Sequence, residues 1–127
     1  MASAGIRHED DVHFVQIKCP LLTASRISDA ASRGHTTACR DTYESMGYSR
    51  GASALGVAVA LGDLMEEQLS NEKICSDWSL YSTRASTSAG IELLRNEVLV
   101  LGNAAGWDPA YRIGHAVMED ALDTAAI

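Results

Sequence analysis

Lys18 is the residue of this sequence whose surroundings most clearly suggest chemistry. It follows an apolar run at residues 14–17 and stands two positions before Pro20. Valine, isoleucine and phenylalanine favour a half-buried strand and proline removes a ladder donor, so the pattern predicts a strand that ends near the lysine. A lysine whose charged form is disfavoured by burial can lose its proton near neutral pH and act as a base beside a hydroxyl. The alternative is a lysine that keeps its charge in water at the strand end.

The segment at residues 86–90 reads Ser-Thr-Ser-Ala-Gly and is the second stretch with potential for chemistry. We expect it to form a turn between two strands. Ser88 then offers a hydroxyl nucleophile, and the small residues Ala89 and Gly90 leave backbone N–H groups open as an oxyanion hole. Serine-rich turns without a catalytic role are common, so an ordinary turn is the alternative.

Arg50 is a third candidate because it stands just before an apolar segment that begins at Gly51. Its planar guanidinium and the N-terminus of the helix predicted there could both face a carbonyl oxygen or an anion. Without a partner, it would be an ordinary surface arginine. The four histidines and three cysteines show no metal-ligand spacing, and no glycine-rich phosphate loop is present. We therefore expect neither a metal nor a cofactor.

The composition limits the class of protein. A length of 127 residues is that of one domain with a single core. The formal net charge of −7 disfavours nucleic acid and anionic membrane surfaces as partners, because both attract basic proteins. Three cysteines without a disulfide pattern, and the lack of a signal peptide or a long apolar span, predict a reducing, cytoplasmic compartment.

The hydrophobic pattern predicts an α/β sandwich with about four strands and with helices on one sheet face. Residues 1–11 are polar and are expected to be a flexible lead-in to a single domain at residues 12–127. Gly56 and Gly62 are interpreted as packing glycines of a buried helix, and residues 98–101 as the most buried strand. The expected elements are a strand at 14–20, a helix at 24–32 capped by Thr23 and ended by Gly34, a helical turn at 41–46, a helix at 51–69, strands at 78–85, 91–94 and 97–101, and a helix from Pro109 to about 124.

Three blocks of this sequence, taken in order, resemble the ring-opening amidohydrolases, the family of cyanuric acid hydrolase and barbiturase. The blocks lie at residues 13–23, 46–56 and 86–93. Members of that family are single chains of three similar domains around a pseudo-threefold axis. This sequence resembles the middle domain, which implies one third of such an architecture.

The resemblance also assigns roles to residues. Lys18 and Ser88 correspond to the lysine–serine pair to which the family's catalysis is usually assigned, and Ser86 is the neighbouring alternative for the nucleophile. In that chemistry the neutral lysine takes the serine proton, the serine attacks a ring carbonyl, and water releases the opened product. The resemblance thus implies a small cyclic imide or amide as substrate.

The remaining implied contacts are with the substrate. Arg50, together with the backbone at Ala89 and Gly90, would hold a carbonyl oxygen. The structural cation of the family belongs to its third domain, so no metal is implied for this chain. One domain supplies only one of three walls, so a homotrimer or an assembly with sister domains would be needed to complete a site. The alternative function is a non-catalytic, self-assembling interaction domain of the same fold.

Overall fold

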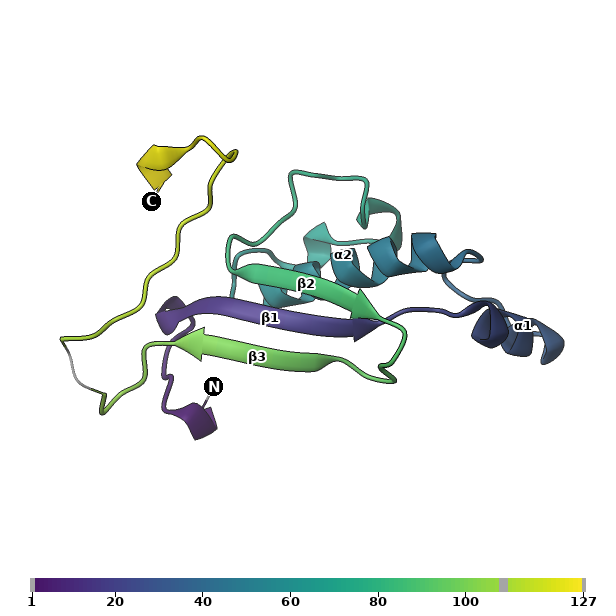
Figure 1. The fold of residues 1–127 in the computed structure, drawn as a ribbon, viewed down its shortest axis with the longest axis horizontal. Helices are drawn as coiled ribbons and strands as arrows, with labels where there is room; N and C mark the ends of the chain where they lie inside the picture. Colours follow the sequence, from purple (N-terminus) through teal and green to yellow (C-terminus); the bar gives the residue numbers. More distant parts are fainter. Residues whose placement is uncertain (1, 108–109, 127) are drawn as a thin grey trace.

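Strand β1 (Val12–Pro20) is the centre of a three-stranded sheet. In the computed structural model, which describes residues 2–107 and 110–126, it lies between a parallel strand β2 (Ala85–Gly90) and an antiparallel strand β3 (Glu97–Gly102) (Figure 1). The fold is therefore mixed α/β, as expected, with three strands in place of about four. Because β1 and β2 are parallel, the chain between them has to cross back along the sheet, and it does so through a helix.

Two α-helices follow β1. Helix α1 (Ala24–Ser32) begins as predicted, with the Thr23 hydroxyl accepting a hydrogen bond from the backbone N–H of Arg26. Helix α2 (Thr42–Ala60) is capped by the Asp41 carboxylate, which accepts from the Glu44 N–H at 2.8 Å. The turn and the buried helix that the sequence suggested separately are thus the two ends of one longer helix, which stops nine residues earlier than expected. No helix in the described residues is long and apolar enough to cross a membrane.

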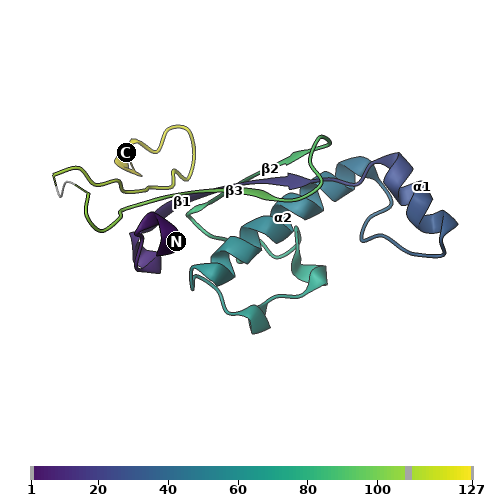
Figure 2. The same cartoon turned by 90° about the horizontal axis from the view of Figure 1, so that it is seen from below.

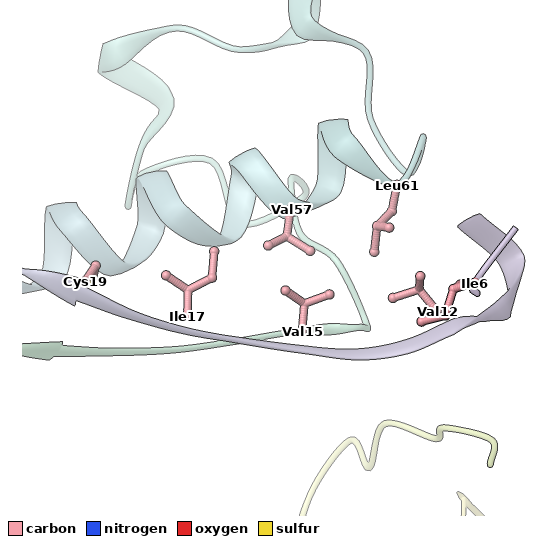
Figure 3. Close-up of a cluster of buried hydrophobic side chains, with 7 residues drawn as sticks. All are labelled: Ile6, Val12, Val15, Ile17, Cys19, Val57 and Leu61. Carbon is pink, nitrogen blue, oxygen red and sulfur yellow. The ribbon is translucent and has the colours of Figure 1, made fainter. Parts of the chain in front are cut away.

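The core lies between α2 and one face of the sheet (Figure 2). Successive strand residues point to opposite faces, so Val15, Ile17 and Cys19 of β1 all reach toward the helix. Figure 3 shows Val57 of α2 pointing back at them. Ile6, in the stretch expected to be a flexible lead-in, is buried in the same cluster. The buried members of the cluster are Ile6, Val12, Val15, Ile17, Cys19, Val57 and Leu61.

The opposite face of the sheet carries the other set of β1 residues, Phe14, Gln16 and Lys18. Among the described elements, no helix covers this face (Figure 2). We call it the open face. It is the surface on which polar side chains of neighbouring strands can meet in contact with solvent.

The second half of the chain differs most from the sequence-based expectation. Residues 78–84 form turns in place of a strand, residues 86–90 form strand β2 in place of a turn, and residues 91–94 form a turn. Strand β3, expected to be the most buried, is an exposed edge on which Val98 is 58% accessible, because α2 packs over β1 and β2 only.

The last helix that the sequence suggested is also absent from the described residues. Residues 110–123 have no regular structure, and only a short 3-10 turn follows (Thr124–Ala126). The expected start at Pro109 lies outside the described residues. Apolar residues of the stripe are not packed into the described core: Val117 is 53% and Leu122 85% exposed. An isolated helix of that length is marginal in water without such packing.

The glycines of α2 also play other parts than expected. Gly56 is exposed, and a methyl group there would meet nothing within 4 Å, while Gly62 follows the helix with φ +72. The close approach is at Gly51, where a Cβ atom would lie 2.8 Å from Cys75 Sγ and 3.1 Å from Ile74 Cγ2. Gly51 is therefore the packing glycine of this helix.

Arg84 ties the ends of several elements together. Its guanidinium donates hydrogen bonds to the carbonyls of Glu9 at 2.7 Å and Leu61 at 3.1 Å, and it forms an ion pair with Asp63. The Ser82 hydroxyl donates to the same carboxylate at 2.6 Å. Burial by itself would raise the pKa of Asp63, but the hydrogen bonds from Ser82 and Arg84 and the charge of Arg84 hold it below its ordinary value.

We expect Arg84→Met to lower the free energy of unfolding by about 3 kcal/mol at pH 7, because it leaves the Asp63 charge and two carbonyls without their donor. Urea unfolding followed by circular dichroism measures this. The matched control is Arg33→Met, which removes the exposed pair of Arg33 with Asp29 and should cost less than about 0.5 kcal/mol. Equal losses in the two variants would contradict the structural role of Arg84.

Gly51 and Gly56, two of the glycines of α2, give a second test. Gly56→Ala should raise the melting temperature, because alanine is the better helix former by about 1 kcal/mol and the site is open. Gly51→Ala should lower it, since crowding against Cys75 costs about 1–3 kcal/mol and outweighs that gain. Differential scanning calorimetry of both variants decides, and shifts of the same sign would contradict the packing described here.

Candidate active site

Lys18 and Ser88 lie side by side on the open face. They are Cα partners in the parallel pairing of β1 with β2, and paired residues of parallel strands point to the same side. Cys19 and Ala89, the next partners along, point to the opposite side and join the core. The strand pairing therefore brings together the amine and the hydroxyl that the sequence analysis singled out.

The two side chains nevertheless have other partners in this chain. The Ser88 hydroxyl accepts a hydrogen bond from the Gln16 amide nitrogen at 3.4 Å. The Lys18 amine forms an ion pair with Glu92, in the turn that follows β2. Among the described residues, no hydrogen bond joins Lys18 to Ser88. The pair is adjacent, but its members are not engaged with each other.

Ser86, the alternative nucleophile, lies on the same face one pleat earlier. Its partner on β1 is Gln16, so it is one pleat away from the position opposite Lys18. Ser86 is half-buried, whereas Ser88 is exposed. Of the two serines, Ser88 is the one placed beside the amine and open to a ligand.

Glu92 is the residue that sequence reasoning missed. Its hydrogen bond and charge raise the pKa of Lys18 above the ordinary value, Glu97 on β3 adds to the rise, and partial burial opposes both. The same ion pair lowers the pKa of Glu92. Of the two alternatives considered for Lys18, these contacts favour the lysine that keeps its charge at the strand end over the neutral base. The only signal for Glu92 was its place within the block at residues 86–93.

Ala89 and Gly90 end strand β2, so they do not form the exposed turn that was expected. The Ala89 side chain packs against the core cluster on the far side of the sheet. Gly90 is buried, and a methyl group there would lie 2.6 Å from the carboxylate carbon of Glu92. Because β2 is an edge strand, the backbone N–H groups along its outer side have no strand partner in the described sheet.

Arg50 lies inside α2 and not at its N-terminus, since the helix begins eight residues earlier. It is exposed, and its spacing of three and seven residues from Ser53 and Val57 puts it on the sheet-facing side of the helix. Helix α2 runs from the Cys19 end of β1 toward Val12 (Figure 3), so Arg50 lies toward the end of the sheet that carries Lys18. It belongs, however, to the helix layer and not to the open face.

The open face as it stands is a set of hydrogen-bond donors on a flat surface. The Lys18 ammonium, the Ser88 hydroxyl and the Gln16 amide could bind carbonyl oxygens of a small polar ring. A hollow of about 540 Å³ lies on the other side of the sheet, between α2 and β3, and its walls include Val57, Val98 and Val100. Among the described residues, no group of three or more His, Cys, Asp or Glu side chains could hold a metal ion.

Comparison with known proteins decides the family. A sequence profile described as amidohydrolase ring-opening protein matches residues 1–127, the whole chain. The chain belongs to the ring-opening amidohydrolase family. This family member is 76% identical over 127 residues to a cyanuric acid amidohydrolase of Ectopseudomonas oleovorans, matching 100% of the chain and 35% of that relative. It is 62% identical to a cyanuric acid amidohydrolase of Enterobacter cloacae, again over 100% of the chain and 34% of the relative.

Solved structures agree with this assignment. The crystal structure of cyanuric acid hydrolase from A. caulinodans superposes with a TM-score of 0.92 at 57% identity, covering 99% of this chain and 36% of that one. A second cyanuric acid hydrolase, described as an evolutionary innovation by structural concatenation, gives a TM-score of 0.76 at 56% identity over 80% of this chain and 28% of the other. The ring-opening amidohydrolase chain thus spans about a third of the length of the relatives it matches.

Proposed function

We propose that this chain forms one wall of a cyclic-amide hydrolase site that opens the cyanuric acid ring, with Ser88 as nucleophile and Lys18 as its base. The observation that carries the proposal is the direct pairing of these two residues on the open face. Relatives up to 76% identical are named cyanuric acid amidohydrolases, which supports the substrate class of a small cyclic imide or amide. Barbiturate rings present similar carbonyls, and we propose that the choice between the two rings depends on walls other than the one formed by residues 1–127.

In the proposed reaction the Ser88 oxygen attacks a ring carbonyl carbon while its proton passes to the neutral Lys18 amine. The ring C–N bond breaks, the released ring nitrogen takes the proton back from Lys18, and an acyl–serine ester remains. Water then attacks this ester while Lys18 accepts a proton from it, the bond between the acyl carbon and the Ser88 oxygen breaks, and Lys18 returns the proton to that oxygen as the opened product leaves. Backbone N–H groups at Ala89 and Gly90 are proposed to hold the carbonyl oxygen. Arg50 lies in the helix layer, so in this chain it is not placed to share that role.

A single wall cannot enclose a substrate, so we propose that the site is completed by assembly. The chain spans about a third of its relatives, and one of those is described as built by structural concatenation. Two features leave surface to cover, namely the open face with Lys18 and the apolar hollow between α2 and β3. A closed ring of three copies, or sister domains of a longer chain, would cover it. We further propose that residues 12–127 act as one domain, and that it works in the cytoplasm because its cysteines are unpaired.

The competing proposal is a self-assembling domain without catalysis. It is favoured by one observation, the ion pair with Glu92 that keeps Lys18 charged and so unable to accept the Ser88 proton. Three identical walls would also leave none specialised for binding alone. Under either proposal we expect weak or no turnover from this chain.

If turnover is present, Lys18→Ala and Ser88→Ala should each lower it by about 10³-fold or more, and the double variant should lose little beyond that, because the two residues act as a unit. Loss of cyanuric acid, followed by liquid chromatography, measures this. Ser32→Ala, an exposed serine of α1, is the matched control and should keep full activity. If Ser86→Ala abolishes turnover and Ser88→Ala does not, the nucleophile is Ser86.

The assembly has its own test. We expect a homotrimer in solution, because the isolated domain leaves apolar side chains exposed on both sides of β3, with Val98 at the hollow and Leu99 on the open face. Light scattering after gel filtration measures the mass, and a monomer at micromolar concentration would refute the trimer. A trimer that leaves cyanuric acid intact would favour the non-catalytic alternative.

A further inference from the structure

The contact between Lys18 and Glu92 joins the middle strand to the turn after β2. The Lys18 side chain is 45% and the Glu92 side chain 54% exposed, so the pair is partly shielded by the sheet. The amine leans toward the carboxyl end of β2, past Ser88, where the Glu92 carboxylate lies over Gly90. The position of the carboxylate thus determines where the amine sits along the strand.

Gly90 provides the space that this contact needs. It is buried and has no side chain, and a methyl group there would lie 2.6 Å from the carboxylate carbon of Glu92. Any larger residue would therefore push the carboxylate away from Lys18. An ordinary surface ion pair needs no such gap, because exposed side chains meet in solvent. The space over Gly90 is therefore a binding position for the Glu92 carboxylate, which we call its seat.

The second acidic neighbour of Lys18 is Glu97, its Cα partner on β3. Lys18 therefore has a carboxylate on each flank, Glu92 from the turn after β2 and Glu97 from the other neighbouring strand. Only Glu92 forms an ion pair with the amine. Glu97 is thus a natural comparison for a charge that is near Lys18 but not in contact with it.

We propose that Glu92 is a positioning residue: its carboxylate, seated over Gly90, places the Lys18 amine and stabilises its charged form, so that Lys18 accepts the Ser88 proton more readily once that carboxylate has moved away. The last clause rests on the proposed function, while the placement and the charge state do not. Glu92 forms no bond with substrate in this scheme. It acts through Lys18 alone, and a neighbouring wall or a bound ring could displace it.

The experiment uses the fact that this chain has only two lysines, Lys18 and Lys73. Protein labelled with carbon-13 at the lysine ε-position gives two NMR signals, which Lys73→Arg assigns. Their chemical shifts are followed as the pH is raised from neutral to strongly alkaline. Lys73, which donates to the Gln68 carbonyl at 2.6 Å, is the internal reference for effects that do not depend on the proposed contact.

Three variants separate the effects of the Glu92 charge, the position of its carboxylate and the Glu97 charge on the Lys18 titration. Glu92→Gln removes the charge of the carboxylate and keeps its size, Gly90→Ala keeps the charge but pushes the carboxylate out of its seat, and Glu97→Gln removes the charge that does not contact the amine. We expect the Lys18 titration to move to lower pH in Glu92→Gln and in Gly90→Ala, and to move less in Glu97→Gln. Lys73 should titrate identically in all four proteins.

The proposal is overturned if Glu92→Gln leaves the Lys18 titration where it was, or if Glu97→Gln moves it equally far. It is also overturned if Gly90→Ala, folded by circular dichroism, leaves Lys18 unchanged, because the seat would then have no effect. If Gly90→Ala does not fold, the difference between the Lys18 titrations of Glu92→Gln and Glu97→Gln tests the proposal.

A second readout separates this proposal from the proposed function. In any preparation that opens cyanuric acid, the rise of kcat/KM with pH should move to lower pH in Glu92→Gln, in step with the Lys18 titration. Turnover whose pH profile ignores Glu92 would overturn the link between Lys18 and the reaction. If no preparation turns over, the proposed function fails, and the NMR titration still decides the placement and charge of Lys18.

Discussion

The hydrogen bonds of Arg84 determine how β1 and β2 pair, and the rest of the structure depends on that pairing. The Arg84 guanidinium is buried and holds Leu61 at the end of α2, Glu9 before β1, and Asp63. Its backbone carbonyl accepts from the Val15 N–H at 2.8 Å, which is the first contact of the parallel ladder. Arg84 stands four residues before Ser88 and Val15 three before Lys18, so the slanted parallel pattern that begins here places Ser88 opposite Lys18.

This pairing tolerates no slip, because the two faces of β1 have opposite character. Val15, Ile17 and Cys19 fill the space under α2, whereas Gln16 and Lys18 point to the open face. A shift of one residue would put a charged amine into the core and a valine into solvent. The burial of one face of β1 therefore fixes the positions of the polar side chains on its other face. Close packing also explains why β2 is built of small residues, because its core-facing side chains lie directly beneath the helix.

The surfaces that remain uncovered connect the fold to its family. A three-stranded sheet with one helix layer leaves a whole sheet face, an exposed edge strand β3 and an apolar hollow beside α2. In a chain that spans about a third of its relatives, these are the surfaces that neighbouring domains or copies can bury. The charge of Lys18 belongs to this partly uncovered state, because its only ion-pair partner among the described residues is Glu92, which is half exposed beside a face that no described helix covers.

Local pattern was enough to predict the strand that ends beyond Lys18 and the helix capped by Thr23, because each is encoded by nearby residue types. The pairing of Lys18 with Ser88 was expected only from the family resemblance, because the two residues lie on different strands. Local pattern was not enough for β2, whose Ala-Ser-Thr-Ser-Ala-Gly sequence has little hydrophobic signal and becomes a strand by pairing with β1. The apolar stripe after Pro109 looked helical, yet it forms no α-helix in residues 110–126, where Val117 and Leu122 stay exposed. Only the tertiary structure brought Glu92 to Lys18 and so raised the pKa of the amine, because the ionisation of a group depends on neighbours that the chain folds beside it.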